Sequence, residues 1–174
     1  MKKTLLAVLL VLGTLSLLNA ATAVKEQPVT LKVRAMLPAG WTVTEKAGGI
    51  KMYERAAQSL EIKDSANVPG FMLTVTDKGH TVAKDAQHKA DYNPYFEIYL
   101  YQLPLMEDQI IKYNRLANAM YNRPAGTQDE YPPRFAFQKG AYIVMKSPTW
   151  GRAASPDIDM MMIKIMSLVR KELP

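Results

Sequence analysis

Residues 95–103 read YFEIYLYQL, and this stretch is the strongest indicator of the fold class. Every second side chain is apolar, which is the pattern of a β-strand with one buried face. Phe96, Ile98 and Leu100 form the face that we expect to meet the core, and the tyrosines of the stretch lie on the opposite face.

The chain before this strand alternates in the same way. Residues 71–76 predict a clear strand and residues 59–62 a weak one. Three further strands are expected to form an N-terminal β-meander: 30–36, 41–44 and 50–55. The polar and nonperiodic residues 77–93 predict a loop, with at most one helical turn.

Two amphipathic helices and a hairpin are predicted after it. Pro104 ends the strand and begins a helix to about Tyr121, whose apolar side chains recur at helical spacing. They are Met106, Ile110, Tyr113, Ala117 and Met120. Residues 134–138 and 141–146 predict a β-hairpin around Lys139-Gly140.

The last helix has the clearest start in the sequence. Ser155 is a favourable N-cap and Pro156 suits the first helical position. A broad apolar stripe follows before the helix closes at Lys171: Ile158, Met161, Met162, Ile165, Leu168 and Val169. We therefore expect one α+β domain over residues 24–174, with an antiparallel sheet and both helices packed on one face, preceded by a flexible arm at 24–29.

The N-terminus has the three parts of a secretory signal peptide. Lys2 and Lys3 precede the apolar run Leu5–Leu18, which is shorter than the roughly 20 residues that cross a bilayer. Ala21-Thr22-Ala23 predicts cleavage after Ala23, so that residues 1–23 are removed, no transmembrane anchor remains and the protein becomes periplasmic or secreted. Cleavage after Ala20 is the alternative.

Composition excludes several classes of function. The chain contains no cysteine, which rules out disulfide scaffolds, thiol nucleophiles and thiolate metal sites. Its 22 Lys and Arg against 16 Asp and Glu give a net charge of +6 without a basic cluster, so no nucleic-acid binding is expected. The glycines fit no phosphate-binding or dinucleotide pattern, and no cofactor is predicted.

The histidines offer a weak candidate site in the 77–93 loop. Imidazole and carboxylate groups suit zinc, and the candidates are His80, His88, Asp85 and Asp91. Their spacing matches no ligand motif, and Lys84 and Lys89 would repel a cation, so solvated loop histidines are the favoured interpretation. The methionines of the last helix are likewise better explained by core packing than by copper.

The tyrosines Tyr95, Tyr99 and Tyr101 are the stronger binding candidates. On an open sheet face they would form an aromatic stripe that suits a sugar, a peptide or a partner protein. Sheet stabilisation by cross-strand pairing is the alternative explanation. Trp150 could join such a surface.

These patterns favour a non-enzymatic binding module of the bacterial envelope, whose partner would be an envelope protein or a glycan. No G-x-S-x-G or S-x-x-K motif of a hydrolase occurs in the chain after the signal peptide. A small periplasmic hydrolase with a site assembled from the loop residues, and a periplasmic metal-binding protein, remain the alternatives.

Overall fold

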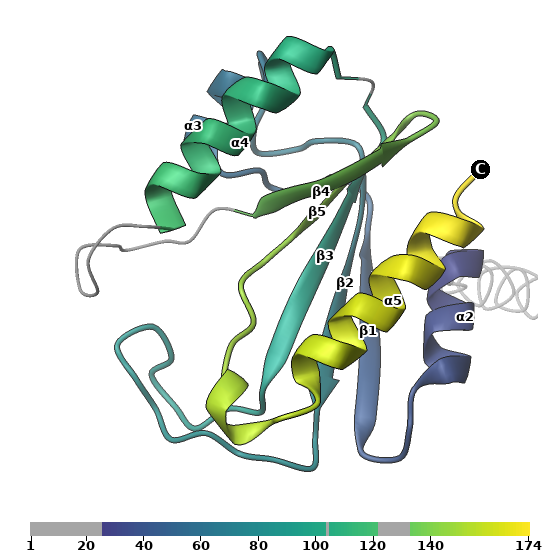
Figure 1. Ribbon diagram of the computed structural model, residues 1–174, viewed down its shortest axis with the longest axis vertical. Coiled ribbons are helices and arrows are strands. Elements are labelled where there is room, and N and C mark those ends of the chain that lie inside the picture. Colours follow the sequence, from purple (N-terminus) through teal and green to yellow (C-terminus); the bar gives the residue numbers. More distant parts are fainter. Residues whose placement is uncertain (1–25, 104, 122–132) are drawn as a thin grey trace, which may run out of the picture.

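The computed structural model describes residues 26–103, 105–121 and 133–174, and it confirms the α+β class (Figure 1). Five antiparallel strands form one sheet in the order β1-β2-β3-β5-β4. The strands are β1 (Trp41–Ala47), β2 (Gly70–Asp77), β3 (Tyr95–Tyr101), β4 (Arg134–Lys139) and β5 (Tyr142–Lys146). The helices of the described residues are α2 (Pro28–Met36), α3 (Glu54–Ser59), α4 (Glu107–Tyr121) and α5 (Ile158–Glu172), with a short 3-10 helix η1 (Arg152–Ala154) before α5.

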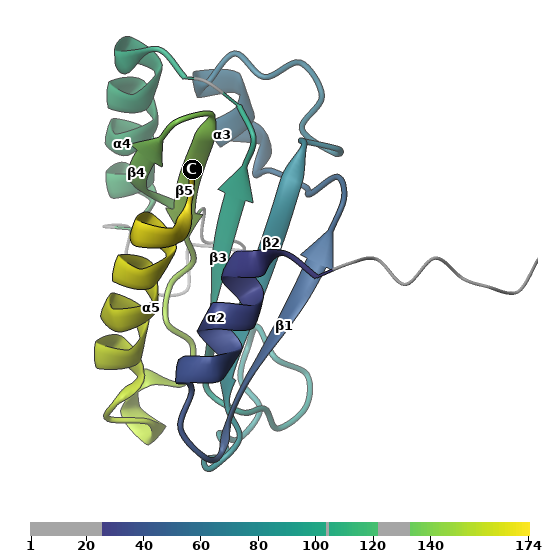
Figure 2. The same ribbon diagram turned by 90° about the vertical axis from the view of Figure 1, so that its right-hand side faces the viewer.

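Helices α2 and α5 lie side by side on one face of the sheet (Figures 1 and 2). The alternation of β3 places Phe96, Ile98 and Leu100 on this face, where all three are fully buried. Their helical partners are the buried side chains Val29, Val33, Ile158, Met161, Ile165 and Val169. The stripe predicted for the last helix is therefore a core stripe, and its burial is the main apolar contribution on this side.

The second helix predicted from sequence packs on the other face, which corrects the expectation that both helices share one. Tyr113 and Ala117 of α4 are buried together with Ile143 and Met145 of β5 and with Tyr101 of β3. Since Leu100 and Val144 belong to the α2–α5 side, adjacent residues of each strand enter different cores. Helices therefore cover both faces of the sheet where β3 ends beside β5, in the upper part of Figure 1.

The first predicted strand is also wrong, because all of residues 30–36 belong to helix α2. Val29 and Val33, one helical turn apart, are buried, whereas Leu31 is 52% exposed. Pro28 occupies the start of the helix, where its fixed φ and missing N–H are tolerated. Pro28 and Val29, assigned to the flexible arm, lie within this helix.

Residues 50–62 do not complete a meander. Ile50 forms only an isolated antiparallel bridge with Val68, and the helix α3 begins at Glu54. The sequence ERAAQS of α3 consists mainly of good helix formers and buries Ala56 and Ala57. The weak strand predicted at 59–62 is also wrong, because Ser59 ends α3 and residues 60–61 form a turn. The strands predicted at 41–44, 71–76 and 95–103 agree with β1, β2 and β3, and the hairpin is confirmed. The 77–93 loop is confirmed as well, and it carries a bridge between Val82 and Tyr92 instead of a helical turn.

The two edges of the sheet are β1 and β4. The β4 edge is irregular, because its register with β5 shifts between Phe135 and Phe137. At the start of β2, Gly70 has a φ of +144°, and a Cβ atom there would lie 2.1 Å from the carbonyl oxygen of Leu100. This close approach of two strands requires glycine.

The predicted signal peptide lies outside the described residues. Within the described ranges, no helix has the length and apolar character needed to cross a membrane.

Candidate binding surface

The structure separates the three predicted tyrosines. Tyr101 is fully buried beneath α3 and α4, while Tyr95 and Tyr99 are half-buried nearer the start of β3. The rings of Tyr99 and Tyr101 stack at a centroid distance of 6.0 Å. Tyr101 therefore belongs to the core, and only the other two can meet a ligand.

The part of this face away from α3 and α4 carries hydroxyl side chains in register. Cross-strand pairing aligns three rows over β1, β2 and β3. The rows are Thr42–Thr76–Tyr95, Thr44–Thr74–Glu97 and Lys46–Met72–Tyr99. Thr42 and Thr44 are exposed and Thr74 and Thr76 half-buried. We call these nine residues the Thr/Tyr face.

Glu97 organises the aromatic part of the Thr/Tyr face. The hydroxyl of Tyr99 donates a hydrogen bond to its carboxylate. Burial raises the pKa of the Tyr99 phenol far above its usual value, and the negative charge of Glu97 raises it further. Tyr99 is therefore held as a neutral donor beside a charged acceptor.

A groove of about 210 Å³ opens at the Lys46–Met72–Tyr99 row. Its walls bring Tyr53, which precedes α3, and Lys51 next to Tyr99. Aromatic rings and ammonium groups thus adjoin the hydroxyl rows, so the surface combines flat apolar area with donors and acceptors. Such a combination suits a polar ligand with carbon–hydrogen faces.

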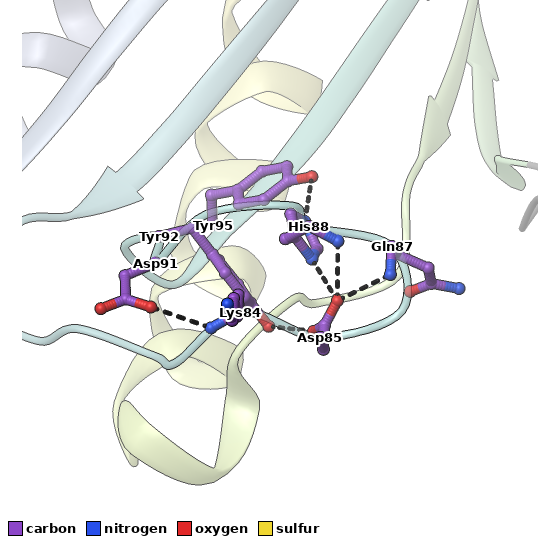
Figure 3. Close-up of polar contacts among 7 residues, drawn as sticks. All are labelled: Lys84, Asp85, Gln87, His88, Asp91, Tyr92 and Tyr95. Carbon is purple, nitrogen blue, oxygen red and sulfur yellow. Dashed lines mark hydrogen bonds and ion pairs between the residues drawn. The ribbon is translucent and has the colours of Figure 1, made fainter.

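At the opposite end of the Thr/Tyr face, Tyr95 meets aromatic side chains of the 77–93 loop, and Figure 3 shows His88 and Tyr92 beside it. His88 stacks on Tyr92 at 3.8 Å and contacts Tyr95 and Trp150 edge-on at 5.8 and 5.4 Å. Tyr95 and Trp150 are also joined by reciprocal backbone hydrogen bonds. We call His88, Tyr92, Tyr95 and Trp150 the aromatic cluster.

Asp85 fixes the geometry of this cluster. One carboxylate oxygen accepts from His88 Nδ1 at 2.9 Å and from two backbone N–H groups, and the other accepts from the Tyr92 hydroxyl at 3.0 Å. Burial opposes ionisation, but the hydrogen bonds outweigh it and hold the pKa of Asp85 well below its usual value. The charged carboxylate orders the loop.

The order Asp85–His88–Tyr95 resembles the carboxylate–imidazole–hydroxyl order of a proton relay. A carboxylate only accepts, so His88 Nδ1 carries a proton toward Asp85, and His88 Nε2 lies 3.1 Å from the Tyr95 hydroxyl. However, burial and the nearby Glu97 raise the pKa of Tyr95 to about 12. The phenol keeps its proton at neutral pH, and the relay acts as a positioning device.

The other predicted loop residues are not brought into the same site. His80 Nδ1 lies 2.7 Å from the buried Asp77, which also accepts from Ser155 Oγ at 2.5 Å. Asp91 accepts from the backbone N–H of Lys84 at 3.0 Å. Within the described part of the chain, no group of three or more metal-ligating side chains forms a candidate metal site.

The Asp77 contact also changes the expected role of Ser155. Its hydroxyl does not cap α5, whose preceding residue is Asp157, and instead bonds across to the end of β2. In this arrangement the carboxylate lies between serine and histidine, whereas a catalytic triad needs histidine in the middle. The contact therefore anchors the start of α5 to the sheet.

Some of this surface could not be found from the sequence. The threonines of the Thr/Tyr face alternate with core residues in predicted strands, but only the register shows that they align.

No family model matches the chain, and neither the curated proteins nor the solved structures contain a match to it.

Proposed function

We propose that this chain is an exported, non-enzymatic binding module that recognises a glycan through the Thr/Tyr face. The observation that carries the proposal is the alignment of threonine, tyrosine and Glu97 side chains in three cross-strand rows. The predicted signal peptide supports an envelope or extracellular location.

The chemistry of the face favours a sugar polymer. Sugars present hydroxyls around their edges and carbon–hydrogen groups on their faces, so they need both hydrogen-bonding groups and aromatic rings. Threonine hydroxyls supply donors and acceptors, Glu97 supplies a charged acceptor and Tyr95 and Tyr99 supply rings. Because strands are rigid, these groups are held in place before the ligand arrives, which lowers the entropy cost of binding.

The hydrolase alternative has less support. Asp85 and His88 do lie together, but the hydroxyl they orient belongs to a tyrosine whose proton is tightly held. Ser155 is buried and donates to Asp77, whose lowered pKa makes this carboxylate a weak base. His88 serves better as a support for the aromatic rings of Tyr92, Tyr95 and Trp150.

The test places a bulky charge in the middle row. Thr44 is exposed on the edge strand, so Thr44→Lys should leave folding intact while obstructing the face. Thr81→Lys, at an exposed position in the loop beyond β2, is the matched control. Binding would be measured by sedimentation with purified peptidoglycan sacculi and by affinity electrophoresis through gels containing neutral polysaccharides.

We expect the wild-type protein and Thr81→Lys to bind at least one of these polymers, and Thr44→Lys to lose at least tenfold in affinity. Equal binding by all three proteins would overturn the assignment of the face. If the wild-type protein bound none of the polymers but did bind an immobilised peptide library, the result would favour a protein partner over a glycan.

A further inference from the structure

A groove between α5 and the β4–β5 hairpin lies on the α2–α5 side of the sheet, apart from the Thr/Tyr face. It consists of two adjoining cavities of about 350 and 500 Å³ that share Lys146, Met162 and Ile163. We call it the hairpin groove. Volumes of roughly 300–1,000 Å³ are typical of small-molecule sites. We propose that the hairpin groove binds an amphiphilic carboxylate, with its head at Lys146 and its hydrocarbon chain along α5.

Lys146 is placed at the junction of the two cavities. It pairs in register with Ile98 on one side and Arg134 on the other, so both cationic side chains extend from the same face of the sheet. Burial lowers the pKa of Lys146, and the positive charge of Arg134 lowers it further. An anionic group beside Lys146 would favour the charged form of this half-buried lysine.

The charges around the groove are unbalanced. Four lining residues are cationic: Arg134, Lys146, Arg152 and Arg170. Asp159 is the acidic residue in the lining, and its carboxylate already pairs with Arg152 and accepts from Thr149 at 3.2 Å. Because Arg152 pairs with Asp159, the positive charges that Lys146 and Arg170 add to the lining are the complement of an anionic head group.

The rest of the lining is apolar. Phe137, Met162, Ile163 and Met166 line the smaller cavity, and the guanidinium of Arg170 lies 5.3 Å from the Phe137 ring. Ile163 is 57% exposed, although it adjoins this apolar wall. A hydrocarbon chain lying on the wall would remove it from water, at roughly 25 cal/mol for each Å² covered. Methionine side chains adapt readily to such a ligand.

The shape and charge together favour a single-chain carboxylate over a phosphate or a peptide. Free phosphate would use the cations but leave the apolar wall exposed. A peptide would bring backbone groups that this methionine and isoleucine wall cannot hydrogen-bond. A carboxylate at the end of an alkyl chain satisfies both parts of the groove.

The experiment uses decanoate below its micellar concentration, with decyltrimethylammonium as the probe of equal chain length and opposite charge. Affinity would be measured by calorimetry, and the position of the chain by NMR of methionine methyl groups. We expect decanoate to bind and to shift Met162 and Met166, while Met106, which is 70% exposed before α4, stays unchanged. Lys146→Met should weaken decanoate binding at least tenfold.

Lys164→Met is the matched control, because Lys164 is an exposed lysine of α5 that does not line either cavity. It should bind decanoate like the wild type. Should Lys146→Met fail to fold, Ile163→Glu supplies the second test, since an exposed position tolerates a charge and the new carboxylate would repel the ligand. Equal affinity for both probes, or undiminished binding by Lys146→Met or Ile163→Glu, would overturn the proposal.

Discussion

Ile165 and Ile163 lie two residues apart in α5 and provide a matched test of how the helix packs. Ile165 is fully buried against the sheet, whereas Ile163 is 57% exposed. Ile165→Ala removes three buried carbon atoms, worth about 2.4 kcal/mol at roughly 0.8 kcal/mol each. The cavity left behind adds to this, and measured costs for such truncations are about 2–5 kcal/mol. We expect a loss of about 3 kcal/mol for Ile165→Ala.

The same substitution at Ile163 should change the free energy of unfolding by no more than about 0.5 kcal/mol. Urea unfolding, followed by circular dichroism, would measure the free energy of unfolding of both variants. The dependence of this free energy on urea concentration should be the same in the variants and the wild type, so that a shifted midpoint reports stability. At roughly 2–4 °C per kcal/mol for a chain of this size, Ile165→Ala should melt about 6–12 °C lower. Similar losses in the two variants would refute the packing of α5 described above.

Three further predictions concern the end of β2, its start and the N-terminus. Hydrogen bonds outweigh burial and lower the pKa of Asp77 in the folded protein. The ionised carboxylate therefore stabilises the fold at pH values above the unfolded-state pKa of about 3.9. This stabilisation is lost as the pH falls through the lower pKa of the folded state. Ser155→Ala should remove about 1.5–3 kcal/mol at pH 7 and lessen the loss below pH 4, so an unchanged pH profile of the urea midpoint would contradict the assigned contact. Gly70→Ala should cost about 3 kcal/mol or more, since its Cβ would overlap the carbonyl of Leu100; wild-type thermal stability would show that the strands separate there without strain. Intact-mass spectrometry of the exported protein should show Val24 as its first residue, and an uncleaved chain in the membrane fraction would contradict export.

The sequence predicted the strands whose alternation is long. Residues 71–76 and 95–101 form β2 and β3, and their core faces are those expected. Residues 28–36 were assigned wrongly because a short apolar run fits both the helical and the strand period. Val29 and Val33 would share one face of a helix, and Leu31 and Val33 would share one face of a strand. Only tertiary contact with the sheet decides between them.

The placement of the helices was harder to predict, although one signal was present. Ile143, Val144 and Met145 are three consecutive apolar residues, and all three are buried. A strand without alternation indicates a sheet covered on both faces. This run could have shown that α4 and α5 lie on opposite sides.

The candidate site was only partly accessible to sequence reasoning. Period-two geometry correctly placed Tyr95, Tyr99 and Tyr101 on one face, but it could not show that Tyr101 lies beneath α3 and α4. The proximity of His88 to Tyr95 depends on the path of the loop, and that of Trp150 on a bridge between distant residues. Such contacts have no periodic signature.

The shifted register in β4 has a consequence for the behaviour of the protein at high concentration. An edge strand can pair with the edge of another molecule when its backbone groups are regularly spaced. The bulge between Phe135 and Phe137 breaks that spacing, and Arg134 and Lys139 place positive charges at the two ends of the strand. Two copies meeting along β4 would face mismatched hydrogen bonds and mutual repulsion, so this edge resists growth into fibrils.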